Sequence, residues 1–134
     1  MTTVFAAFVV ANVGDHFAAT TRAADRGEAG KIGFPGGKLD AGETAREAAM
    51  REAAEEGWLV TGLSDEPYYE AIIDGNLVQW FHAIGATILA TFKEQGRILP
   101  IVAHRIDLIN SGWGNDAALE GACYREISDE EFFA

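Results

Sequence analysis

The chain has 134 residues, of which 49% are apolar and 23% are charged. This balance predicts one folded domain spanning residues 1–134 and argues against a disordered chain. The formal net charge of −11 and the lack of a basic stripe argue against sequence-specific nucleic-acid binding, because the protein would repel phosphates. No apolar run approaches about 18 residues, and no basic region precedes the apolar N-terminal stretch, so we expect neither a transmembrane helix nor a signal peptide. The single cysteine, Cys123, cannot form an internal disulfide, which favours a reducing cytoplasm.

The N-terminal third predicts a series of short strands. Val4–Val10 and Phe17–Arg22 are rich in strand-forming residues and flank a turn at Gly14-Asp15. Asp25–Gly30 is polar and contains glycine, which indicates a loop. Ile32–Phe34 then predicts a short strand that ends at the chain breaker Pro35-Gly36-Gly37.

A single long helix is predicted in the middle of the chain. Glu43–Glu56 is dense in Ala, Glu, Arg and Met, all of which favour helices. Thr44 followed by Glu47 fits a capping box at its start, and Gly57 is placed to end it.

The remaining elements alternate between extended and helical patterns. Asp74-Gly75-Asn76 is a strong hairpin signal between Tyr69–Ile73 and Leu77–Ile84. The other expected elements, in chain order, are a bend and a further strand in Ile84–Phe92, an extended segment in Gly96–Ala103, a short helix in His104–Asn110, a strand in Ala122–Ile127 and a final helical turn capped by Ser128. The order predicts a mixed α+β domain with one dominant helix.

Three glutamates in the central helix carry the strongest chemical signal. Glu52, Glu55 and Glu56 are spaced i, i+3 and i+4, so their carboxylates share one helix face. Like charges placed in this way repel one another, and a hard divalent cation such as Mg²⁺ would remove the penalty. The simpler alternative is a solvated acidic helix, and that alternative is the commoner one for glutamate pairs in general.

The residues around these glutamates fit a phosphate site. Glu43 and Arg51 lie about two helical turns apart, a distance that an ion pair can bridge. The glycines of Pro35-Gly36-Gly37 leave bare backbone that can offer a carbonyl to a metal or an amide to a phosphate. Lys38 adds a cation where an anionic substrate could arrive.

Together these residues resemble the Nudix box. That motif reads Gly, five residues, Glu, seven residues, Arg-Glu, an aliphatic residue, any residue, Glu-Glu, any residue and Gly. The matching positions, without a gap, are Gly37, Glu43, Arg51, Glu52, Glu55 and Glu56. A chance match of all six is on the order of 10⁻⁷ per starting position, and the lead-in Phe34-Pro35-Gly36 is also similar to the family pattern.

The chain departs from the Nudix box at two positions. Ala53 stands at the aliphatic position and is only smaller than expected. Trp58 stands where the box, at about residues 37–58, ends in glycine. Gly57, one residue earlier, is the candidate to replace the final glycine of the box. The departure therefore concerns the end of the helix and leaves the acidic residues in place.

The resemblance implies a Nudix fold, a mixed β-sheet between α-helices, and a hydrolase that acts on a phosphorus-containing anhydride. It implies Mg²⁺, with Mn²⁺ as the alternative, bound by Glu52, Glu55 and Glu56, with the Gly36 or Gly37 carbonyl completing the coordination. Glu52 is the alternative catalytic base. Glu43 and Arg51 would hold the loop, and Gly37 and Lys38 would contact the substrate.

Outside the box the sequence yields weaker candidates. Some MutT-like members carry a further catalytic glutamate late in the chain, and Glu120, followed by Gly121, matches that position; its alternative is an ordinary loop carboxylate. Trp80 and Phe81 are expected on opposite strand faces, with core packing favoured over base stacking. Trp113 lies in a glycine-containing loop that could cover the substrate.

The sequence therefore predicts a cytoplasmic Nudix pyrophosphohydrolase that acts on a small nucleotide-like molecule, with no membrane partner. A (d)NTP is the leading substrate, and a dinucleotide, a nucleotide sugar or coenzyme A are the alternatives. Two other classes stay open: an inactive nucleotide-binding Nudix module, and an unrelated acidic interaction domain.

Overall fold

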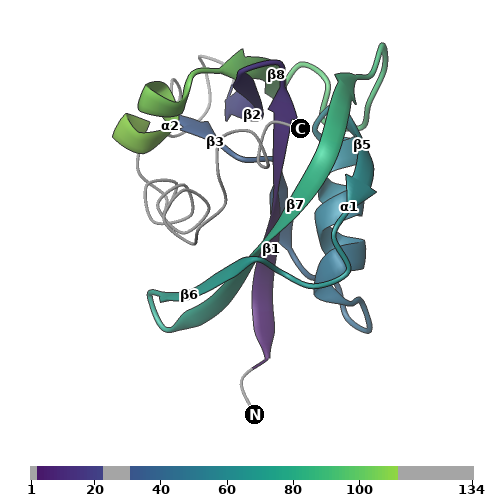
Figure 1. The fold of residues 1–134 in the computed structure, drawn as a ribbon. Coiled ribbons are helices and arrows are strands. Elements are labelled where there is room, and N and C mark those ends of the chain that lie inside the picture. Colours follow the sequence, from purple (N-terminus) through teal and green to yellow (C-terminus); the bar gives the residue numbers. More distant parts are fainter. Residues whose placement is uncertain (1–2, 23–30, 112–134) are drawn as a thin grey trace.

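The structure is a computed structural model that describes residues 3–22 and 31–111. Its strands form one mixed sheet with a long helix on one side (Figure 1). The elements are β1 (Val4–Val13), β2 (His16–Arg22), β3 (Ile32–Gly33), β4 (Gly36–Lys38), α1 (Ala45–Glu55), β5 (Trp58–Leu63), β6 (Tyr69–Ile73), β7 (Asn76–Ile88), β8 (Ile98–Ala103) and α2 (Arg105–Ser111).

Strand β1 is the centre of the sheet. It pairs in parallel with β7 and antiparallel with β2 and β4. Strand β7 pairs antiparallel with β5 and β6, and β2 pairs antiparallel with β3 and β8. The path β3-β2-β1-β7-β5 runs through the sheet, so segments far apart in sequence meet beside the central helix (Figure 1).

Both predicted hairpins are present. Val13 pairs with His16 across the turn at Gly14-Asp15. Ile73 pairs with Asn76, and the two residues between them, Asp74 and Gly75, have φ values of 50° and 81°. Two successive positive φ values match the tight hairpin turns whose twist suits adjacent strands. Local turn chemistry was therefore enough to place both hairpins.

One strand prediction was wrong, and two strands, β4 and β5, were missed. Ile84–Phe92 does not bend into a new strand, because β7 continues to Ile88 in register with β5. The glycines after Pro35 do not simply break the chain, because Gly36–Lys38 forms β4. Strand β5 was not expected, because its exposed Leu59 and its Gly62 blur the alternation of apolar and polar residues.

The absence of a side chain at Gly36 explains β4. A Cβ atom at this position would overlap the Ala7 carbonyl oxygen and the Phe8 Cα atom of β1, and the Gly36 φ is 151°. Only glycine lets the two backbones approach this closely. Pairing with β1 then extends Gly-Gly-Lys into a strand despite its low strand propensity.

The sheet separates two hydrophobic cores. On one face, the small residues Ala48, Ala49 and Ala53 of α1 are fully buried and let the helix lie close to the sheet. On the other face, Leu108 of α2 packs into a core that contains Phe17 and other aromatic residues. Helices therefore cover both faces of a mixed sheet, which confirms the predicted α+β architecture.

Several predictions lie outside the described residues. They are the loop Asp25–Gly30, the strand Ala122–Ile127, the final turn capped by Ser128, Cys123, Trp113 and Glu120. Within the described residues, no helix has the length and apolar character needed to cross a membrane.

Candidate active site

Helix α1 begins as its sequence predicts. Thr44 is the N-cap, and its side-chain oxygen accepts a hydrogen bond from the backbone N–H of Glu47 at 3.1 Å. The Glu47 carboxylate accepts from the backbone N–H of Thr44 at 2.9 Å, which completes the capping box. The helix start is thus fixed, and every later side chain of α1 has a defined direction.

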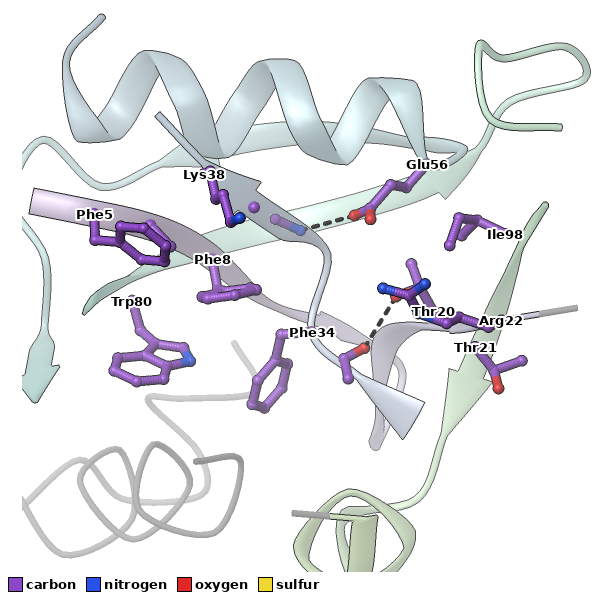
Figure 2. Close-up of a pocket in the computed structure, with 14 residues that line it drawn as sticks. Phe5, Phe8, Thr20, Thr21, Arg22, Phe34, Lys38, Glu56, Trp80 and Ile98 are labelled. Atoms are coloured by element: carbon purple, nitrogen blue, oxygen red, sulfur yellow. Dashed lines mark hydrogen bonds between the residues drawn. The ribbon is translucent and has the colours of Figure 1, made fainter. Parts of the chain in front are cut away.

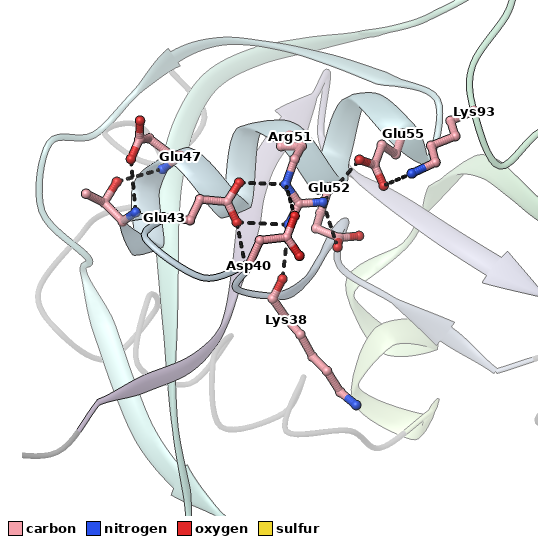
Figure 3. Close-up of polar contacts among 9 residues, drawn as sticks. Lys38, Asp40, Glu43, Glu47, Arg51, Glu52, Glu55 and Lys93 are labelled. Carbon is pink, nitrogen blue, oxygen red and sulfur yellow. Dashed lines mark hydrogen bonds and ion pairs between the residues drawn. The ribbon is translucent and has the colours of Figure 1, made fainter.

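Arg51 is the hub of a polar network on α1 (Figure 3). Its guanidinium donates to both carboxylate oxygens of Glu43, at 2.6 and 2.9 Å. One terminal nitrogen lies 3.1 Å from both Glu52 and Glu55, and the other donates to the carbonyl oxygen of Lys38 at 3.1 Å. The bidentate contact lowers the pKa of Glu43 to about 2. The predicted Glu43–Arg51 pair therefore forms, and Arg51 also joins α1 to β4, the glycine strand Gly36–Lys38.

The glycine strand also contacts two glutamates of the helix end. A Cβ atom at Gly37 would lie 2.7 Å from the Glu52 Cδ atom, so a side chain here would displace the Glu52 carboxylate. The Gly36 backbone N–H donates to Glu56 Oε1 at 2.9 Å. Strand β4 and α1 thus fix each other where the carboxylates gather.

Glu56 stands apart from the other two glutamates. It is the C-cap of α1, and Gly57, with a φ of 103°, reverses the chain directly after it. Burial raises the pKa of Glu56 to about 8, and the nearby charges of Glu52, Glu94 and Glu55 add to the effect, whereas the Gly36 hydrogen bond opposes it. Burial also raises the pKa of Glu52. The helix end therefore gathers carboxylates where solvation is poor, and this favours their protonated forms.

Glu94 is a further carboxylate of this cluster that the sequence analysis missed. It lies in the segment between β7 and β8, and its backbone N–H donates to the Glu55 carbonyl oxygen at 2.8 Å. Lys93 places its ammonium 3.7 Å from a carboxylate oxygen of Glu55. No motif marks this segment, and its position beside α1 arises only from the fold.

A pocket of about 330 Å³ opens beside the carboxylates (Figure 2). Its aromatic wall comprises Phe5, Phe8, Phe34 and Trp80, and the Phe8 and Trp80 rings stack with centroids 5.9 Å apart. The polar residues that line it include Thr20, Thr21, Arg22, Lys38 and Glu56. Glu56 thus belongs both to the carboxylate cluster and to the pocket wall. Aromatic walls with a few polar groups are typical of sites for small organic molecules.

Comparison with known proteins agrees with this geometry. The NUDIX domain family model matches residues 1–71, which include the capping box, Arg51 and all three helix glutamates. The chain belongs to the Nudix family. The resemblance inferred from residues 37–58 is therefore confirmed.

Individual Nudix relatives extend the comparison. The chain is 36% identical over 76 residues to the 8-oxo-dGTP diphosphatase of Escherichia coli K12, a match that covers 54% of this chain and 58% of that protein. The fold is similar to that of an ADP compounds hydrolase, with a TM-score of 0.71, 22% identity, and coverage of 96% of this chain and 75% of the other. It is also similar to a MutT NUDIX hydrolase from Burkholderia pseudomallei, with a TM-score of 0.68, 22% identity, and coverage of 87% and 95%. These structures confirm the Nudix fold, and each of the three is named as a diphosphatase or a hydrolase.

The structure places the remaining predicted Nudix site residues as follows. Gly36 uses its amide to bind Glu56, and the Lys38 side chain lines the pocket and points away from Arg51 (Figure 3). Trp80 and Phe81 lie on opposite faces of β7, as expected, and both are buried. Trp80 also lines the pocket, but its side chain is only 1% exposed, in agreement with the predicted core packing.

The donor chemistry of the Nudix helix suits a hard divalent cation. Glu52, Glu55 and Glu56 offer only carboxylate oxygens, and their mutual repulsion is part of what raises the pKa of Glu56. Within the described ranges, no three acidic or histidine side chains converge on one point at metal-ligand spacing. Glu52 and Glu55 are instead turned toward Arg51. The residues thus fit a metal in type and charge, with two of the carboxylates bound to Arg51 and the third, Glu56, bound to the Gly36 amide.

Proposed function

We propose that this protein is a Mg²⁺-dependent pyrophosphohydrolase that cleaves a diphosphate bond in a nucleoside diphosphate derivative, with a (d)NTP as the leading substrate. The observation that carries the proposal is the double role of Glu56, which lines the aromatic pocket and belongs to the carboxylate cluster of α1. A ligand that fills the pocket necessarily lies beside the carboxylates. The proposal is also consistent with the names of the relatives, an 8-oxo-dGTP diphosphatase and an ADP compounds hydrolase.

The residues around the pocket would have three different roles in the proposed reaction. Glu52, Glu55 and Glu56 would hold the metal, which stabilises charge on the attacking and leaving oxygens when it is bound. Arg51 and Glu43 would keep β4 against the helix, so that Gly36 and Gly37 can approach the substrate closely. Arg22 would add a cation at the end of the pocket near Glu56, where phosphates would lie.

The aromatic wall would hold the nucleoside of the proposed substrate. Flat rings bind one another through offset or edge-to-face contacts. The exposed Phe5 and the half-buried Phe8 would offer such surfaces, while Trp80 and Phe34 line the pocket as buried rings. Phe34 is itself fixed by an edge contact with Phe17, with ring centroids 6.2 Å apart. Dinucleotides, nucleotide sugars and coenzyme A share the diphosphate and a base, and they are the alternative substrates.

The direct test of the proposal is hydrolysis of a nucleotide panel. Purified protein is incubated with (d)NTPs, ADP-ribose, nucleotide sugars, dinucleotides and coenzyme A, with Mg²⁺, with Mn²⁺ and with EDTA. We expect metal-dependent cleavage of a diphosphate bond. The products are measured by a phosphate-release assay or by chromatography. Nucleotide binding without turnover in either metal would identify an inactive binding module instead.

A second expected result concerns metal and thermal stability. Mg²⁺ should raise the Tm of the wild-type protein, because a ligand that binds only the folded state stabilises it. In the Glu52→Gln/Glu55→Gln variant, the Mg²⁺-induced rise in Tm should disappear. The control is Asp65→Asn/Glu66→Gln, which removes the same charge from a loop outside the cluster and should keep the response. An undiminished response in the first variant would show that Mg²⁺ binds elsewhere.

A further inference from the structure

Lys38 has an unusual environment for a lysine in an acidic protein. Its ammonium lies 5.4 Å from the centroid of the Phe5 ring, in cation–π contact. Among the described residues its side chain forms no ion pair, although the chain carries a net charge of −11. Phe5 is itself 40% exposed and lines the pocket with Lys38. The two side chains thus present to the pocket an aromatic surface and a cation that has no ion-pair partner in residues 3–22 and 31–111.

The position of Lys38 separates it from the carboxylates. Gly36, whose amide binds Glu56, lies two residues earlier in β4, a distance of about 6.6 Å along a strand. The Lys38 carbonyl faces Arg51, whereas its side chain runs away from the carboxylate network (Figure 3). At the aromatic end of the pocket, Lys38 lies near Phe5 and Phe8, and Arg22 and Glu56 lie toward the other end (Figure 2).

This arrangement places the two cations, Arg22 and Lys38, beside different parts of a bound nucleotide. A diphosphate that is cleaved beside Glu56 lies near Arg22, so the group at the aromatic end is the base. We propose that Lys38 is a specificity-determining residue that reads the base, and that the aromatic end of the pocket accepts a nucleobase with a keto oxygen on the edge facing Lys38. This inference rests on the proposed function, because that function places the phosphates at Glu56.

The chemistry of the ammonium group sets the preference. A lysine ammonium has three donors and no acceptor, so it binds a keto oxygen or a ring nitrogen lone pair. An exocyclic amino group at the same place would set donor against donor. Lysine contacts to the O6 and N7 acceptors of guanine follow the same rule in nucleic-acid recognition, and a good bidentate contact discriminates by roughly 5- to 150-fold.

The test uses IMP and AMP, which carry an oxygen and an amino group, respectively, on the same ring carbon. Affinities are measured by titration calorimetry with Mg²⁺ present, since neither monophosphate contains a diphosphate bond to cleave. The wild-type protein should bind IMP at least about 5-fold more tightly than AMP. Lys38→Met, which keeps the apolar stem over Phe5, should weaken IMP binding to the level of AMP and leave AMP within about 2-fold. Lys38→Gln, with both a donor and an acceptor, should also bind the two ligands equally.

Arg22→Met is the matched comparison, because it removes the cation at the other end of the pocket. This variant should weaken the binding of IMP and the binding of AMP by the same factor. The proposal is overturned if Lys38→Met weakens both ligands equally, if it changes neither, or if the wild-type protein shows no preference. Selective IMP binding without hydrolysis of any member of the nucleotide panel would refute the proposed activity and leave the role of Lys38 intact.

Discussion

Glu56→Gln is expected to lower kcat by at least about 10²-fold at saturating Mg²⁺, because loss of a carboxylate ligand removes several kcal/mol of charge stabilisation. The fold should survive, since the Gln amide oxygen can still accept the hydrogen bond that Gly36 donates to Glu56 at 2.9 Å. Steady-state kinetics with the best substrate of the panel measure the effect. Near-wild-type turnover would remove Glu56 from the catalytic machinery.

The same variant should change how the stability of the metal-free protein depends on pH. The pKa of Glu56 is raised from 4.5 to about 8, mainly by burial, so the folded state holds this proton at pH values where the unfolded chain has lost it. The resulting stabilisation is complete below pH 4.5 and is lost as the pH rises through 8. Glu56→Gln should flatten this decline and unfold at higher urea concentration than wild type at pH 9.

A matched control isolates the contribution of Glu56 to the pH dependence. Glu66→Gln neutralises an exposed carboxylate outside the cluster and should retain the wild-type pH profile in EDTA. Urea unfolding of the three proteins between pH 5 and pH 9 supplies the comparison. If the stability of Glu56→Gln fell with rising pH as steeply as that of the wild-type protein, another group would carry the proton.

Loss of either partner of the Glu43–Arg51 pair is expected to reduce kcat by up to about 10²-fold. The pair joins α1 to β4, because Arg51 binds Glu43 and the Lys38 carbonyl together. Without the Glu43–Arg51 pair, β4 can move by about 1 Å from the carboxylates. A displacement of that size can lower kcat by about 10²-fold. We therefore expect Glu43→Ala and Arg51→Ala to be similarly slow, and the double variant to be little slower than either.

The double-mutant cycle separates a structural unit from two independent charges. Rate effects that multiply across the cycle would contradict the account, since residues that act as a unit are not additive. Arg46→Ala is the control on the same helix. Arg46 donates to the carbonyl oxygens of Leu63 and Ser64, away from the carboxylates, so its loss should cost stability and leave kcat near wild type.

The sequence by itself determined the parts of this protein that depend on local spacing. Thr44 and Glu47 lie three residues apart, which fixed the helix start, and Asp74-Gly75 fixed one hairpin turn. The spacing of Arg51 and the three helix glutamates identified the family, because a motif carried by one helix needs no knowledge of distant contacts. Glu43 and Arg51 were paired correctly for the same reason.

Only the tertiary structure decided the features that join distant segments. Strand β4 exists because β1 accepts a backbone without side chains at Gly36, and β7 extends to Ile88 because β5 pairs with it. The place of Glu94 beside α1 depends on the path of the chain between β7 and β8. Propensity and periodicity act over a few residues, whereas these contacts join residues 20 or more positions apart along the chain. The aromatic pocket, with Lys38 at one end and Glu56 at the other, is a product of the same long-range pairing.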